Sequence, residues 1–175
     1  MSGYALRTIG LVCTLVLAAV QSGAAQATPH EAAPRLLGDT LSAPAGCSTA
    51  MAIGALRTWI RALATGDADL ARRSVAPGFV WVRVNRFRTP DSPFVARDTS
   101  SLMDFVRRRA PYHDRWTLQS ITFNGWRENR LRMGPIFFLR TADDLGSTAL
   151  EGFGKAEYEC PSGLYVLSVG RREPW

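Results

Sequence analysis

Residues 59–67 have the sequence Trp-Ile-Arg-Ala-Leu-Ala-Thr-Gly-Asp, and this stretch decides the fold. Apolar residues around it recur at the spacing of an amphipathic helix: Ile53, Leu56, Ile60 and Leu63. Gly66 suits the left-handed conformation that ends many helices, and Asp67 is a good N-cap for the next one. The stretch therefore predicts a helix from about Ser48, a sharp break, and a short second helix that Pro77 cannot continue.

Residues 79–87 follow with the alternation of a β-strand. One face of that strand carries Phe79, Trp81, Arg83, Asn85 and Phe87, and the other carries Val80, Val82, Val84 and Arg86. Either face can point into the protein, so the pattern leaves the orientation of Arg83 open.

The remainder predicts one more helix and an antiparallel sheet. A loop with Pro90 and Pro93 leads to a third helix, which begins at Asp98 or Thr99 and ends by Pro111. Four strands are expected at residues 116–123, 131–141, 149–160 and 164–170, separated by turn sequences. Paired glycines at 152 and 154 favour a bulge in the third of these strands. Helices followed by a strand meander define an α+β class.

This order of elements, with the Gly-Asp break at its centre, resembles the NTF2-like superfamily over roughly residues 48–170. The resemblance implies three N-terminal helices packed in a curved antiparallel sheet, which together form a cone with a pocket. The family includes ketosteroid-isomerase-like and SnoaL-like enzymes, dehydratases, epoxide hydrolases, and members that only bind or pair.

The isomerase residues are not matched. A gap-free alignment places Trp59 where that enzyme has its oxyanion-hole tyrosine and Arg83 where it has its general-base aspartate. A guanidinium stays protonated and cannot abstract a proton, and an indole has no ionisable proton to exchange. The isomerase mechanism is therefore not expected, and whether the chain is an enzyme stays undecided.

A pocket could still bind a ligand. If the Trp81 and Arg83 face points inward, we expect aromatic walls and a fixed cation that clamps the carboxylate of a flat or apolar ligand. The candidate ligand-binding residues are Trp59, Trp81, Arg83, Tyr112, Tyr158 and Glu157. In the alternative, Trp59 and Trp81 belong to the core and Arg83 pairs with an acid such as Glu157.

His113 is the candidate catalytic residue, because imidazole can act as a base near neutral pH. Asp114 is expected to point away from it, since adjacent residues of an extended segment face opposite sides. Asp104 or Glu157 could orient the ring instead. The competing interpretation is a surface histidine in a loop.

Residues 1–27 have the layout of a cleavable secretory signal: Arg7, an apolar run, and Ala25-Gln26-Ala27 at the cleavage site. Residues 28–46 predict a flexible tether rich in Ala and Pro, and residues 47–175 the NTF2-like domain. Cleavage near Ala27 would place the mature chain in the periplasm or outside the cell. Its two remaining cysteines, Cys47 and Cys160, are then expected to form a disulfide, with two buried thiols as the alternative.

Composition limits the partners. The chain has 175 residues, 46% of them hydrophobic, and a net charge of +6 in which Lys155 is the only lysine. Arg107, Arg108 and Arg109 end the third helix, where cations complement the helix dipole. Neither a metal nor another cofactor is expected, and we expect neither a nucleic-acid partner nor a stable membrane anchor.

The leading interpretation is an exported binding or accessory module. One alternative is a SnoaL-like lyase, isomerase or hydrolase that uses His113. The other is an interaction protein that forms homodimers through its sheet.

Overall fold

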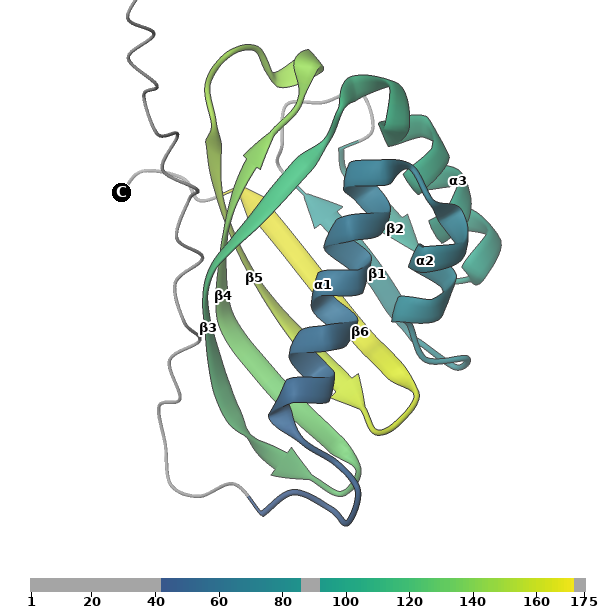
Figure 1. The fold of residues 1–175 in the computed structure, drawn as a ribbon, viewed down its shortest axis with the longest axis vertical. Helices are drawn as coiled ribbons and strands as arrows, with labels where there is room; N and C mark the ends of the chain where they lie inside the picture. The colour runs from purple at the N-terminus through teal and green to yellow at the C-terminus, as the bar shows by residue number, and fades with distance from the viewer. Residues whose placement is uncertain (1–41, 86–91, 172–175) are drawn as a thin grey trace, which may run out of the picture. The chain divides into compact units, whose positions relative to one another are not determined.

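The computed structural model describes residues 42–85 and 92–171, which fold into a curved six-stranded sheet with α-helices against one face (Figure 1). The expected signal segment, 1–27, and residues 28–41 of the expected tether lie outside the described residues. The helical elements are α1 (Thr49–Thr65), α2 (Ala68–Ser74), α3 (Thr99–Arg109), and the short 3-10 turns η1 (Ala110–Tyr112) and η2 (Asp143–Leu145).

The helix caps are those that the sequence predicts. Ser48, Asp67 and Asp98 cap α1, α2 and α3, and each side chain accepts a hydrogen bond from the backbone N–H three residues further on. Gly66 ends α1 in the left-handed region, at φ 69°. A side chain at Gly66 would place its Cβ 2.5 Å from the Cβ of Ala110, so the glycine also allows α1 to end close to η1.

The sheet has the strand order β2-β1-β6-β5-β4-β3, and its pairs are antiparallel except β1 with β6, which is parallel. The predicted α+β class and the four-strand meander β3 to β6 are confirmed. The short strand β2 was not predicted, because three residues beside Pro93 carry no recognisable alternation. The strands are β1 (Trp81–Asn85), β2 (Phe94–Ala96), β3 (Arg115–Arg127), β4 (Arg130–Thr141), β5 (Leu150–Glu159) and β6 (Gly163–Arg171).

A bulge interrupts β4, and the prediction of a bulge at Gly152 and Gly154 was wrong. Both glycines keep regular pairing with β4 and β6, whereas the register of β4 shifts between Met133 and Ile136. The extra residue is accommodated at Gly134-Pro135, where Gly134 has φ 148° and proline has no N–H to donate to a ladder.

The sheet has an inner face, which packs on the helices, and an outer face on the opposite side. Val82 and Val84 are each only 1% exposed, whereas Trp81 and Arg83 are half-buried on the outer face. The structure therefore decides the orientation that the sequence left open: the valine face of β1 points inward. A disulfide joins Cys47 to Cys160, as predicted, and ties the segment before α1 to the end of β5.

Candidate functional site

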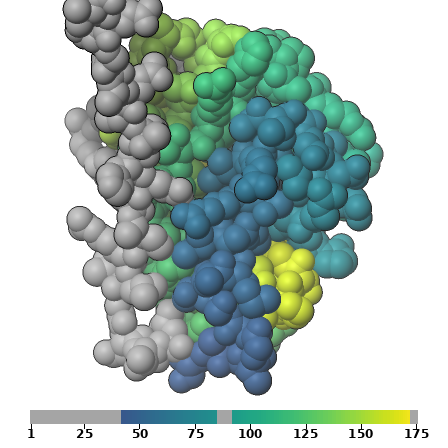
Figure 2. All heavy atoms as spheres, in the orientation of Figure 1, coloured from purple at the N-terminus to yellow at the C-terminus, as the bar shows by residue number. Residues whose placement is uncertain are grey.

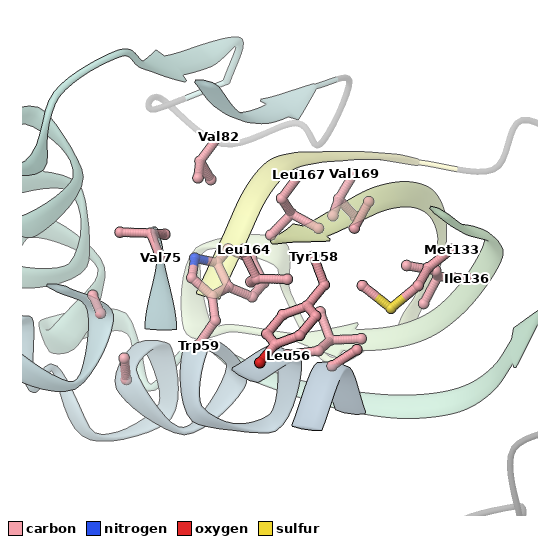
Figure 3. Close-up of a cluster of buried hydrophobic side chains, with 14 of the residues drawn as sticks. Leu56, Trp59, Val75, Val82, Met133, Ile136, Tyr158, Leu164, Leu167 and Val169 are labelled. Atoms are coloured by element: carbon pink, nitrogen blue, oxygen red, sulfur yellow. The ribbon is translucent and has the colours of Figure 1, made fainter. Parts of the chain in front are cut away.

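The inner face of the sheet is occupied by a continuous apolar core (Figure 3). Trp59 on α1 and Tyr158 on β5 lie within it, at 0% and 2% exposure. The blue atoms of α1 cover this side of the domain in the space-filling view (Figure 2). Burial raises the pKa of the Tyr158 phenol, and the Trp59 indole N–H finds no acceptor within the described part of the chain. These two aromatic residues therefore pack in the hydrophobic core and do not line an open pocket.

The outer face carries side chains in rows, because paired residues on neighbouring strands point to the same side of a sheet. One row holds Trp81, Val166, Glu157 and Arg132, from β1 through β6 and β5 to β4. The adjacent row holds Arg83, Ser168 and Lys155. The rows are linked on β1, where the guanidinium carbon of Arg83 lies 4.9 Å from the centroid of the Trp81 ring.

Two adjoining depressions open on this outer face, and we call them together the outer groove. The first, of about 430 Å³, is lined by Trp81, Asn124, Arg132, Met133, Lys155, Ala156, Glu157 and Val166. The second, of about 480 Å³, is lined by Asn124, Gly134, Pro135, Phe153, Gly154, Lys155, Ser168, Val169, Gly170 and Arg171. Both contain Lys155 and Asn124, whose side-chain amide donates to the Gly134 carbonyl oxygen at 2.6 Å.

The cations near the groove fall into two groups. Arg132 pairs with Glu157 at 3.3 Å, and Arg130 pairs with Glu159 at 3.0 Å. Arg83, Lys155 and Arg171 form no ion pair with any described residue. The groove therefore has an excess of positive charge that no residue of the described ranges neutralises.

A buried ion-pair network lies at one end of the sheet, where α3, η2 and the ends of β3 and β4 meet. Asp114 is fully buried and accepts from Arg109 Nε at 2.7 Å and from Arg140 Nε at 2.9 Å. The Arg109 guanidinium also donates two hydrogen bonds to Asp144. Burial alone would lower the pKa of Arg109, but its bonds to Asp144 and Asp114 raise it overall, and the pKa of Asp144 is lowered by the same contact.

This network was not predicted. Arg109 was expected only to complement the dipole at the end of the third helix, and the structure buries it completely. The signal was present, because Leu102, Phe105 and Arg109 lie at the spacing of a single helix face. Arg140 likewise continues the inward alternation of Ile136 and Phe138 along β4.

His113 pairs with a residue that the sequence did not suggest. Its Nδ1 lies 2.7 Å from Asp143 Oδ2, and the two side chains are 71% and 64% exposed. Asp104 pairs with Arg107 instead, and Glu157 lies on the outer face. Asp114 points away from the ring, as expected. A depression of about 460 Å³ adjoins the pair and is lined by His113, Arg115, Thr141, Ala142, Asp143, Gly146 and Ser147.

The structure divides the six candidate ligand-binding residues among three places. Trp81, Arg83 and Glu157 lie together on the outer face, whereas Trp59 and Tyr158 lie in the core. Tyr112 lies in η1, where the Arg109 guanidinium carbon is 4.7 Å from the centroid of its ring. A single pocket with all six residues as its walls is therefore not formed.

The described residues contain no group of three or more His, Cys, Asp or Glu side chains that could hold a metal ion. Within residues 42–85 and 92–171, every helix is too short or too polar to cross a membrane.

Comparison with known proteins identifies the fold. No family model and no curated protein sequence matches the chain. A candidate calcium/calmodulin-dependent protein kinase II association domain from Xanthomonas campestris superposes with a TM-score of 0.55 at 14% identity, over 79% of this chain and 97% of that one. A candidate dehydratase of the NTF2-like family from Streptomyces avermitilis gives 0.53 at 10% identity, over 70% and 95%.

A third structure, the orange carotenoid protein of Anabaena (Nostoc) binding canthaxanthin, gives a TM-score of 0.52 at 8% identity, over 80% of this chain and 39% of that one. Sequence identities this low show a shared fold and do not show a shared function. The domain has the NTF2-like fold, an α+β cone of three helices in a curved sheet. The neighbours include an association domain, a candidate dehydratase and a protein that binds canthaxanthin, so the function has to be argued from the site.

Proposed function

We propose that the mature protein is a binding module that holds a small organic ligand in the outer groove. The observation that carries the proposal is the pair of adjoining depressions, about 430 and 480 Å³, on a face where Trp81 presents an aromatic wall. These volumes are in the range of small-molecule sites. The inner face, by contrast, is filled with core side chains.

Tryptophan fluorescence tests this location. Trp81 lines the groove and Trp59 is buried in the core. A quenching aromatic ligand should lower the emission of the wild-type protein and of the Trp59→Phe variant, but have little effect on Trp81→Phe. Quenching that survives Trp81→Phe and disappears in Trp59→Phe would place the ligand inside the cone and contradict the proposal.

A second experiment identifies ligands. The melting temperature of the protein is measured with each member of a panel of aromatic carboxylates, sterols and anionic glycans, because a ligand that binds the folded state raises it.

We also propose that the protein is exported, with residues 1–27 as the signal peptide. The disulfide between Cys47 and Cys160 supports an oxidising compartment. The protein recovered from the periplasm and the medium should have Thr28 as its N-terminal residue. An N-terminus at Met1 in that exported protein would refute cleavage.

A second candidate function is acid–base catalysis at His113. The observation in its favour is the 2.7 Å contact between its Nδ1 and Asp143, because a carboxylate in this position orients the imidazole ring. The His113→Gln variant tests it: a turnover found for any substrate should fall by two or more orders of magnitude, whereas an unchanged rate would exclude this residue as the base.

A further inference from the structure

We infer that the ligand of the outer groove is an organic carboxylate with a flat apolar body, and that Lys155, Arg171 and Arg83 hold its anionic end. This inference rests on the proposed function, since it names the class of ligand for the same groove. Lys155 is its centre, because it lines both depressions.

The charges on the face support an anion. Three cations near the groove, Lys155, Arg171 and Arg83, have no carboxylate partner among the described residues. A cleft lined by charges of one sign concentrates its field and attracts a ligand of the opposite sign. Among the described residues, the acids that line or border the groove are Glu157 and Glu159; each is neutralised by an arginine, so neither opposes an incoming anion.

The row geometry supplies hydrogen-bond donors as well as charge. Arg83 and Lys155 lie on either side of Ser168, one strand away in each direction. Strands are about 4.8 Å apart, so the Cα atoms of the two cations are about 10 Å apart. Long side chains from these positions can converge on an oxyanion above the Ser168 hydroxyl. Arg83 Nε finds no acceptor within the described chain, so this guanidinium keeps a hydrogen-bond donor that no described group uses.

The apolar residues that line the outer groove indicate the shape and polarity of the rest of the ligand. Trp81 and Val166 supply apolar surface in the first depression, and Pro135 and Phe153 in the second. Phe153 is 46% exposed, although it is a large hydrophobic residue. Gly134 lets β4 lie close to Lys155 at the edge of the second depression, because a Cβ there would lie 2.9 Å from the Cβ of Lys155. A flat aromatic or alkyl group fits between such walls.

The same charges argue against a polyanion. Arg130 and Arg132 would extend the positive surface along β4, but Glu159 and Glu157 pair with them. Along β4, therefore, the charge beside the groove is neutralised, and Lys155, Arg171 and Arg83 are left to bind a single carboxylate.

The experiment compares an acid with its neutral isostere. 4-Nitrophenylacetic acid and 4-nitrophenylacetamide have the same aromatic body, and their affinities for the mature protein are measured by calorimetry and by quenching of tryptophan emission. We expect the acid to bind at least tenfold more tightly than the amide, because hydrogen bonds to a charged group are stronger than neutral ones. Lys155→Gln should remove most of that preference, and Lys155→Arg should keep it.

Arg61→Gln is the matched control, since it also removes one positive charge, but from the exposed surface of α1 on the other side of the sheet. It should change the acid's affinity by less than about threefold, because an exposed charge far from the ligand is screened by salt. Melting curves of all variants verify that they fold. If acid and amide bind equally and Lys155→Gln has no effect, the inference is wrong but the groove remains a binding site. If neither probe quenches Trp81 and no member of the panel raises the melting temperature, the proposed function fails, and the inference with it.

Discussion

Asp144 accepts two hydrogen bonds from the guanidinium of Arg109, at 2.6 and 2.7 Å. The pair is a bidentate contact of the kind that fixes both partners in one geometry. It joins η2, in the connection between β4 and β5, to the last turn of α3. Because Asp114 binds the same arginine from the other side, the loop, the helix and the start of β3 are held by one cation.

This contact makes the stability dependent on pH in the acid range. The hydrogen bonds from Arg109 hold the pKa of Asp144 below its ordinary value of 3.8. A depressed carboxyl pKa stabilises the folded state fully above the unfolded pKa, and this contribution is lost as pH falls through the lower, folded pKa. Urea unfolding of the wild type should therefore show a falling stability below about pH 4. The Asp144→Asn variant should show a smaller decrease over the same window, and identical slopes would contradict the assignment.

Replacing Asp114 should be far more damaging. It is fully buried between Arg109 and Arg140, and an uncharged side chain would leave both guanidinium groups under-compensated in the interior. Breaking a buried pair costs about 3–5 kcal/mol. We expect Asp114→Asn to lower the free energy of unfolding by about that amount.

Asp104→Asn is the control, because Asp104 pairs with Arg107 on an exposed helix surface. Its cost should be about 0–1 kcal/mol. The free energy of unfolding of both variants is measured by chemical denaturation. An equal loss in the two variants would mean that the buried contacts of Asp114 with Arg109 and Arg140 do not stabilise the fold more than an exposed ion pair does.

The sequence predicts the elements of this protein well, because caps and periodicity are local signals. Asp67 and Asp98 mark helix starts, and Gly66 marks an end, without any knowledge of tertiary structure. The buried network depends on charged residues at inward positions of those same patterns. Arg109 follows Leu102 and Phe105 on one helix face, but a cation near a helix C-terminus also has an ordinary surface explanation. Local rules cannot choose between the two.

The candidate site was harder to predict because it depends on which face of β1 is buried. Alternation gives two faces, and only the pairing of β1 with β6 puts Arg83 beside Ser168 and Lys155. That pairing is parallel, and the two strands are far apart in the sequence. No short turn connects them, so the sequence contains no local signal for the pairing. The hollow beside Lys155 depends in turn on the bulge at Gly134, which the sequence placed in the wrong strand.

The disulfide should be a large contributor to stability. Cys47 and Cys160 are 113 residues apart, and in the chain-entropy account a loop of that length is worth about 4–5 kcal/mol. The double variant with serine at both positions should lose several kcal/mol, with about 4–5 as the upper expectation. Wild-type protein treated with a reductant should unfold at the same denaturant concentration as that variant. Reduction without a change in the unfolding midpoint would show that the bridge is not formed.

Ketosteroid isomerase activity should be absent. Arg83 stands where the aligned enzyme has its base, and the structure puts it on the outer face, away from Tyr158 and Trp59. The wild type should therefore not convert a β,γ-unsaturated ketosteroid to its conjugated isomer. The Arg83→Asp variant should not gain the activity, because a carboxylate there would face solvent rather than the interior. Conversion by either protein, followed by the absorbance of the conjugated ketone, would overturn this orientation of β1.

Tyr158 should limit stability at alkaline pH. Burial in the core raises the pKa of its phenol above the ordinary value of 10.0, because the phenolate cannot be solvated there. Above pH 10 the unfolded chain loses this proton while the folded chain keeps it, so unfolding is favoured as pH rises. The free energy of unfolding of the wild type should therefore decrease more steeply above pH 10 than that of Tyr158→Phe. The difference between the two proteins, measured by urea titration at successive pH values, cancels the ionisation of Lys155 and of the other tyrosines. A difference that stays constant with pH would mean that the Tyr158 hydroxyl reaches solvent in the folded protein.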